Sequence, residues 1–179
     1  MLSRRRKDLN DYQPESSAGK GYVYRGQYWQ PSIQGSDLLF FKALMTAVTC
    51  VNFGLLYVMG RLNLPSLRML YVVLPFLLLL FFSGRALLAA FSLFGWKEKM
   101  TLHQHKQSWK RLGQSGLLAA LTGAALLLAE IIYLFFGGGQ IQQETPMVVL
   151  IITSAAVMVA VWRVMVGLPC LVEDRKYVG

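Results

Sequence analysis

Apolar residues gather into four long blocks along the chain, with polar residues between them. The blocks cover residues 38–59, 67–94, 116–136 and 147–168. Each is about 20 residues or longer, the length that an α-helix needs to cross the hydrocarbon core of a bilayer. The pattern predicts an all-α membrane protein, a four-transmembrane-helix bundle over residues 37–172, in contact with the lipid bilayer. Residues 1–36 form a tail before the bundle and residues 173–179 a short tail after it.

The third block, residues 116–136, has no polar stripe, so as a helix it must have lipid or protein on every side. Small residues recur along it every four positions: Gly116, Ala120 and Ala124 in one row, Ala119 and Gly123 in another. Such spacing lets two helix backbones approach closely within a membrane. We therefore expect this helix to be central to the bundle.

Composition and charge agree with this class of protein. The chain is 55% hydrophobic and only 15% charged, which is unusual for a soluble domain. Its formal net charge of +9 could suggest nucleic acid as a partner, but in a four-span chain basic residues report orientation instead. They concentrate in the N-terminal tail and between the second and third spans, both of which belong in the cytoplasm. We predict a multi-pass protein of the cell membrane, with the N-terminus and the C-terminus cytoplasmic and no nucleic-acid partner.

The basic N-terminal tail divides into two parts. Residues 1–20 are polar and charged, which predicts a mobile arm. Beyond them, alternation and the Arg25-Gly26 pair predict a hairpin of residues 22–24 with residues 27–29. Aromatic side chains suit the membrane interface, and docking to a partner subunit is the alternative. The predicted interface anchors are Tyr22, Tyr24, Tyr28, Trp29, Trp96 and Trp109.

Residues 95–115 form the main cytoplasmic connection. Thr101 and Gln104 fit a capping box, and Leu102, His105 and Trp109 recur at helical spacing. The pattern predicts a short amphipathic helix on the inner leaflet. His103 and His105 are two residues apart, which on a helix is a poor arrangement for one metal ion, so we expect no metal site.

The candidate intramembrane polar site consists of Glu130, Arg68, Asn52 and Arg85. Glu130 is too deep to reach water easily, and a charge at the centre of a span costs about 2.5 to 3.5 kcal/mol, so we expect it to be paired or protonated. Arg68 belongs to the same outer half of the bilayer and is the expected partner in an ion pair. There are two alternatives. Glu130 is part of a proton- or cation-coupled site, or it is either protonated on its own or paired with a residue of another subunit.

The other polar residues within the spans have structural interpretations. Asn52 should hydrogen-bond across helices, with a ligand contact as the alternative. Arg85 and Lys42 should extend toward the cytoplasmic interface, and for Arg85 a paired position in a conduit is the alternative. Ser36, Ser66 and the Thr145-Pro146 pair are expected to start the first, second and fourth spans.

No arrangement of residues points to catalysis. The chain has no phosphate-binding glycine loop followed by Lys and Ser or Thr, no CxxC and no HExxH, and no nucleophile beside a plausible His and acid. Cys50 and Cys170 lie at different depths, so a disulfide is not expected. We predict no catalytic residues, no cofactor and no enzymatic activity.

The tail sequence YVYRGQYW, the span segment VVLPFLLLLFFSGR and the amphipathic cytoplasmic stretch together resemble uncharacterised small four-span proteins of bacterial cytoplasmic membranes. The resemblance covers most of the chain and implies no activity. We expect an accessory or scaffold subunit that packs against another membrane protein through small-residue faces; a homo-oligomer is the other possible assembly. The alternative is a small oligomeric transporter that uses Glu130, which would require a polar cavity reaching that residue.

Overall fold

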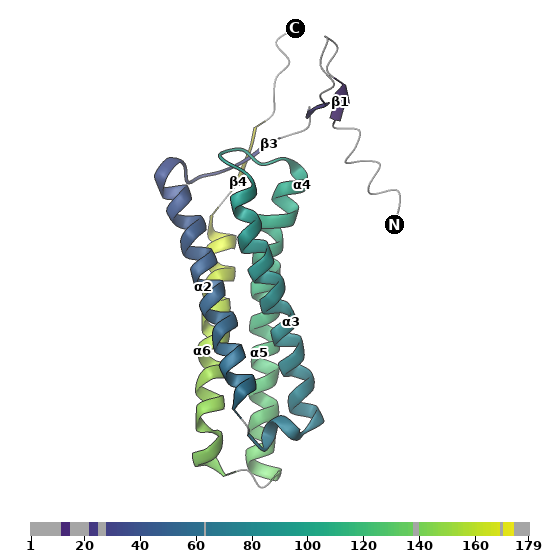
Figure 1. Ribbon diagram of the computed structural model, residues 1–179, viewed down its shortest axis with the longest axis vertical. Coiled ribbons are helices and arrows are strands. Elements are labelled where there is room, and N and C mark those ends of the chain that lie inside the picture. The colour runs from purple at the N-terminus through teal and green to yellow at the C-terminus, as the bar shows by residue number, and fades with distance from the viewer. Residues whose placement is uncertain are drawn as a thin grey trace.

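The computed structural model describes residues 12–14, 22–24, 28–62, 64–137, 140–168 and 170–173. Four long helices run side by side as one bundle (Figure 1). They are α2 (Gly35–Arg61), α3 (Leu70–Ser92), α5 (Arg111–Phe136) and α6 (Ile141–Gly167). All four are long and apolar enough to cross a membrane, so the protein is an all-α, multi-pass membrane bundle as the block pattern predicts.

Helix α5 is the central helix of the bundle, as expected. Its most extensive packing is against α3 on one side and α6 on the other. Glycines make the α5–α6 contact close: a Cβ at Gly116 would lie 3.2 Å from the carbonyl oxygen of Met158, and one at Gly123 would lie 3.1 Å from the Cβ of Ala155. The predicted small-residue face therefore packs against another helix of the same molecule, except for Ala124, which is exposed.

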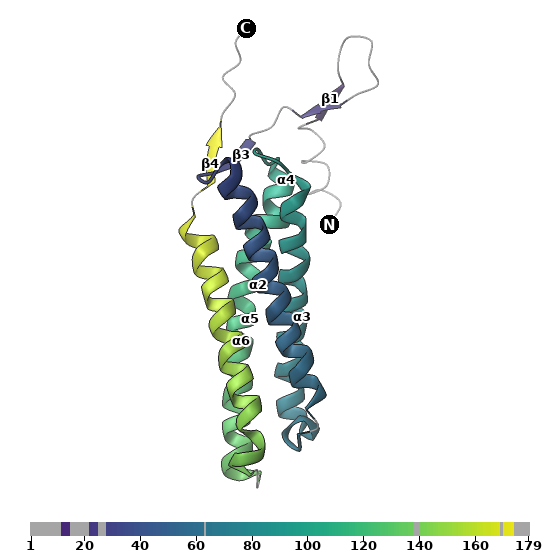
Figure 2. The same cartoon turned by 60° about the vertical axis from the view of Figure 1, so that its left-hand side comes forward.

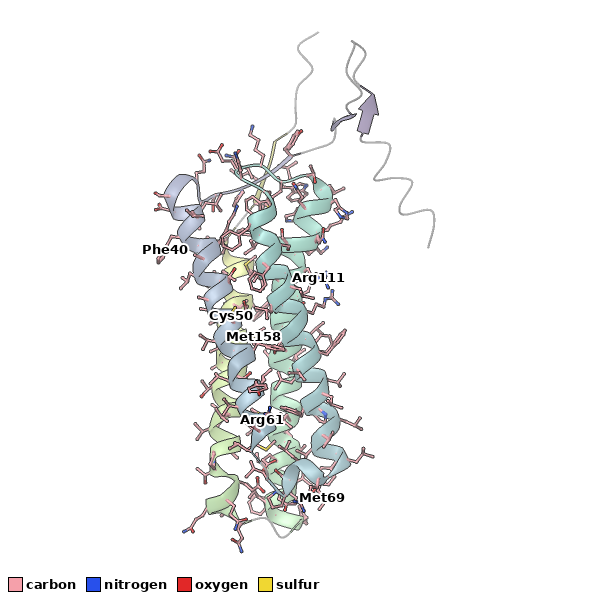
Figure 3. The ribbon with its side chains drawn as sticks, viewed as in Figure 1. Phe40, Cys50, Arg61, Met69, Arg111 and Met158 are labelled. Atoms are coloured by element: carbon pink, nitrogen blue, oxygen red, sulfur yellow. The ribbon has the colours of Figure 1, made fainter. Side chains whose placement is uncertain are left out.

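Helix α2 packs on α3 and α6 and lies in front of α5 in Figure 2. The bundle surface is strongly apolar: the exposed fraction is 70% for Phe40, 62% for Phe81 and 87% for Phe136. Phe40 can be followed in Figure 3 at the outside of α2. Large apolar side chains facing outward in this way are those that lipid would cover.

Three predicted helix starts are wrong. Helix α2 begins at Gly35, which has a positive φ of 63°, and not at Ser36. Ser66 opens a short 3-10 helix, η1 (Ser66–Arg68), and α3 follows only at Leu70. Helix α6 begins at Ile141, so that Pro146 lies within the helix and not at its first position.

The connection between α3 and α5 also differs from the prediction. After η2 (Leu93–Gly95), the capping box of Thr101 and Gln104 forms as expected. It starts one continuous helix, however: α4 (Leu102–His105), the π-helical η3 (Lys106–Lys110) and α5 together run for 35 residues. Trp109 and Leu112 are buried against the protein, so this segment extends the third span and is not a separate helix on the leaflet surface.

Short strands join the two ends of the chain at one end of the bundle (Figure 1). Strand β3 (Tyr28–Pro31) pairs antiparallel with β4 (Cys170–Glu173), and Trp29 also bridges to Met100. The predicted hairpin is therefore wrong. An isolated hairpin is marginal in water, and β3 instead finds partners in two other segments of the chain.

Strand β2 (Tyr22–Tyr24) pairs with β1 (Tyr12–Pro14), within the tail predicted to be a mobile arm. The rest of that arm, and Pro169, which was expected to end the fourth span, lie outside the described residues. Because β3, β4 and Met100 meet, both tails and the connection after η2 share one end of the bundle. We refer to it as the terminal end.

Candidate functional site

Three polar side chains are buried together at the end of the bundle opposite the terminal end. They are Glu130 of α5, Glu144 of α6 and Ser66 of η1, with exposed fractions of 0%, 1% and 0%. The Oγ of Ser66 donates a hydrogen bond of 2.9 Å to one carboxylate oxygen of Glu144, and its backbone N–H donates one of 3.3 Å to the other. We call these three residues the acidic cluster.

The early start of α6 places Glu144 in this cluster. Because the helix begins at Ile141, Glu144 lies in its first turn, where a carboxylate interacts favourably with the N-terminal end of the helix dipole. Glu144 also continues the buried face of α6, which includes Met147, Ile151 and Ser154. That three- and four-residue spacing was present in the sequence and is the signal that could have identified Glu144 as buried.

The predicted hydrogen-bonded ion pair between Glu130 and Arg68 does not form. Both carboxylate oxygens of Glu130 are buried and lack a hydrogen-bond partner, whereas Arg68 is exposed. The reason is the short helix η1, which turns Ser66 into the bundle and Arg68 outward. Glu130 interacts electrostatically with a second carboxylate, Glu144, where a cation was expected.

The chemistry open to the acidic cluster follows from two carboxylates in a low-dielectric interior. They repel each other when both are charged, and a proton or a small cation between them removes that repulsion. Tyr133, one turn after Glu130, is buried and interacts electrostatically with both groups. Among the described residues there is no group of three or more His, Cys, Asp or Glu side chains that could hold a metal ion.

Asn52 is the centre of a second polar group, which joins three helices. Its side-chain N–H donates a hydrogen bond of 3.2 Å to Ser83 of α3, and its side-chain oxygen accepts one of 2.8 Å from Ser154 of α6. All three side chains are buried. The prediction that Asn52 hydrogen-bonds across helices is confirmed.

Lys42 lies at the terminal end, but it does not extend toward the membrane interface as predicted. Its ammonium is buried and donates hydrogen bonds to the backbone carbonyls of Trp96, at 2.5 Å, and Lys97, at 3.2 Å. It also lies 3.7 Å from the ring centroid of Trp96. The cation therefore satisfies carbonyls that follow the end of α3, where positive charge is favourable.

Two of the six predicted interface anchors are core residues. Trp96 and Trp109 are buried, and Trp96 donates a hydrogen bond of 3.2 Å to Ser108. Trp29 and Tyr28 are half-buried on β3, where Trp29 stacks on His105 at 4.2 Å between ring centroids. Tyr22 and Tyr24 lie on β2, and their side chains are outside the described residues.

Arg85 of α3 is half-buried and lines a cavity of about 590 Å³ together with Arg111 of α5. In each arginine the Nε atom is buried and has no hydrogen-bond partner. No sequence pattern associates Arg111 with Arg85, since the two are on different helices. Their position relative to each other depends on how α3 packs against α5.

Comparison of the chain with models of protein families, with curated proteins and with solved structures finds no match. The resemblance to small four-span proteins of bacterial membranes stays a prediction. The function must therefore be argued from the fold and its polar and small-residue features.

Proposed function

We propose that the protein is a non-enzymatic accessory or scaffold subunit of a membrane complex. In the proposed arrangement it lies in the cell membrane with both termini in the cytoplasm. That orientation is supported by Lys97, Lys99, Lys106 and Lys110, which belong to the connection at the terminal end, because basic connections are retained in the cytoplasm.

The observation that carries the proposal is a row of small residues on the lipid-facing side of α2. Ala43, Ala47, Cys50 and Gly54 are all exposed, at spacings of four, three and four residues, so they lie along one side of the helix. Cys50 is labelled about midway along α2 in Figure 3. We call these four residues the α2 stripe.

Nothing in the described part of the chain requires the glycine of the α2 stripe. A Cβ at Gly54 would meet no atom within 4 Å, and Gly54 is not among the glycines with positive φ. A helix-interior glycine costs about 1 kcal/mol relative to alanine. By contrast, the lipid-facing side of α3 carries bulky side chains, including Leu77, Phe81 and Leu88.

A small-residue row exposed to lipid lets a helix of another protein approach closely, and helix association in membranes depends on such packing. The stripe is a separate surface from the internal glycine face of α5, which is already occupied by α6. On α6 itself, Thr153, Ala156 and Ala160 are also exposed, so a second small face lies on a helix that packs against α2.

The proposal is tested by extracting the full-length protein gently from its own membrane and identifying the co-purifying chains by native mass spectrometry. We expect a membrane-protein partner in fixed stoichiometry. The variant Ala47→Leu/Gly54→Leu should release it, because leucine side chains would hold the partner helix away. Leu78→Ala, at an exposed position on α3, is the matched control and should retain the partner.

The remaining outcomes overturn the proposal. A bare monomer, or an oligomer of this chain alone, is incompatible with an accessory role. Retention of the partner by the stripe variant would likewise contradict the assignment of α2 as the interface.

A second candidate function, a small oligomeric transporter that uses Glu130, is favoured by the acidic cluster. A buried Glu130 that faces another carboxylate is the kind of site that exchanges a proton or cation. The cavities at Arg85, His105, Lys42 and Tyr57, all in the described part of the chain, include neither Glu130 nor Glu144. Proton or cation flux into proteoliposomes that is lost in Glu130→Gln would favour transport over the scaffold role.

A further inference from the structure

A groove on the outside of the bundle combines two arginines with an apolar wall. Its volume is about 590 Å³, and it is lined by residues of three helices. The lining residues are Phe53 of α2, Arg111 of α5 and, from α3, Leu77, Leu80, Phe81, Gly84, Arg85, Leu87 and Leu88. We call it the arginine groove.

The groove is open to the surrounding membrane. Leu77, Phe81 and Leu88 are among the exposed large apolar residues of the bundle. Arg111 can be followed in Figure 3 on the side of the bundle formed by α3 and α5, in the half nearer the terminal end. An occupant could therefore enter sideways from the bilayer, without passing through the protein.

The depth of the two arginines matches one leaflet of the membrane. Arg111 lies about 38 Å along α5 from Phe136, and Arg85 about 22 Å along α3 from Leu70, by helix rise. A hydrocarbon core is about 30 Å thick, within about 40 to 45 Å for the whole bilayer. Arg111 thus lies at the headgroup level of the leaflet at the terminal end, and Arg85 lies below it, within reach of a long side chain.

Both arginines have unused hydrogen-bonding capacity. The Nε atom of each is buried without a partner, and a buried donor left unpaired costs about 1 to 3 kcal/mol. No residue that lines the groove is acidic, so the two positive charges are not neutralised within it. Guanidinium groups match phosphate oxygens in geometry and can donate two parallel hydrogen bonds to them.

We propose that the arginine groove binds an anionic phospholipid from the leaflet at the terminal end. Arg85 and Arg111 donate hydrogen bonds to the lipid phosphate, and one acyl chain lies along Phe53, Leu80, Phe81 and Leu88. The proposed ligand satisfies both features of the groove, since its phosphate neutralises the two guanidinium charges and its chain covers the exposed apolar wall. The site is independent of the α2 stripe and of the proposed scaffold role.

The test is native mass spectrometry of the full-length protein released from detergent micelles and titrated with lipids of identical acyl chains. Phosphatidylglycerol is the anionic probe and phosphatidylcholine the zwitterionic one, while inorganic phosphate tests for an anion site without an apolar wall. We expect phosphatidylglycerol to bind more tightly than phosphatidylcholine, and phosphate alone to bind weakly or not at all.

Two variants separate the parts of the site. Arg85→Gln/Arg111→Gln should weaken phosphatidylglycerol binding by about tenfold or more for each arginine, because charge-assisted hydrogen bonds are lost. Gly84→Leu keeps both arginines and fills the groove; its Cβ makes only an ordinary 3.5 Å contact with Phe53, so the fold should tolerate it. It should weaken binding of both lipids.

Arg163→Gln is the matched control, because Arg163 is an exposed arginine of α6 in the same half of the bundle. It should leave both affinities unchanged. The proposal is overturned if the double variant binds phosphatidylglycerol as the native protein does, or if Arg163→Gln weakens binding equally. It is also overturned if phosphate alone binds as tightly as the lipid, or if the double variant loses a protein partner and keeps its lipid.

Discussion

Replacing Asn52 with leucine tests whether the polar group at the middle of the bundle holds three helices together. Leucine is close to asparagine in size but makes no hydrogen bonds, so the substitution removes the bonds to Ser83 and Ser154 without opening a large cavity. The two serine hydroxyls can then turn to carbonyls one turn earlier in their own helices, which limits the cost of leaving them.

The expected magnitude follows from the two hydrogen bonds. Side-chain hydrogen bonds between membrane helices contribute about 0.6 kcal/mol on average and about 1.7 kcal/mol at most. Asn52→Leu should therefore lower the free energy of unfolding by about 1.2 kcal/mol, and by no more than about 3.4 kcal/mol. The bond to Ser154, at 2.8 Å, should carry more of this than the bond to Ser83, at 3.2 Å.

The assay is reversible unfolding in mixed micelles as the mole fraction of sodium dodecyl sulphate rises, followed by circular dichroism. A double-mutant cycle of Asn52→Leu with Ser154→Ala isolates the shared bond and should give a coupling energy of about 0.6 to 1.7 kcal/mol. Thr153→Ala is the control, since that exposed hydroxyl bonds only to its own helix, at the carbonyl of Val149. A coupling energy within about 0.3 kcal/mol of zero would refute the argument.

Three further predictions use other parts of the molecule. Gly116→Leu should destabilise the bundle by about 1 to 3 kcal/mol or more in the same assay, because its Cβ would meet rigid backbone. Gly54→Leu should not destabilise it, because a Cβ there meets no atom and leucine favours the helix more than glycine does; equal losses would contradict the internal role of Gly116. Lys42→Met should cost about 2 kcal/mol, since a charged donor to two carbonyls is lost, and unchanged stability would contradict that role. Burial raises the pKa of the Cys170 thiol to about 11. Because only the thiolate is alkylated, the alkylation rate of Cys170, measured in the Cys50→Ser variant, should rise about tenfold per pH unit from pH 7 to 10. A plateau of the rate near pH 9 would contradict this burial.

The parts of the fold that follow from simple periodicity were predictable. Block length alone predicted the four spans, and the two rows of small residues, Gly116-Ala120-Ala124 and Ala119-Gly123, predicted that the third span is central. Asn52 was predictable as a bonding residue because a polar amide inside a membrane needs partners. Its two partners were not, because Ser83 and Ser154 are identified only by the relative rotation of three helices.

The errors have a common physical origin in the helix ends. Pro146 suggested a first helical position, yet α6 starts five residues earlier, which converts Glu144 from a loop residue into a buried one. Likewise, the short helix η1 before α3 turns Ser66 into the bundle and Arg68 outward, which removes the expected ion pair. Lys42 and Trp96 were assigned to the membrane interface because no periodic signal revealed that other segments of the chain bury both side chains.

The pairing of β3 with β4 has a consequence for how the molecule is made. Residues 28–31 are synthesised about 140 residues before their partners, residues 170–173. At about 5 to 20 residues per second, the early strand waits on the order of ten seconds for the late one. During that interval β3 can already bridge to Met100, and the first span is held by its helix contacts and by the hydrogen bonds of Lys42. The strand pair can therefore form only after all four spans have been synthesised, and a nascent chain truncated before residue 170 would lack it even with all four spans inserted.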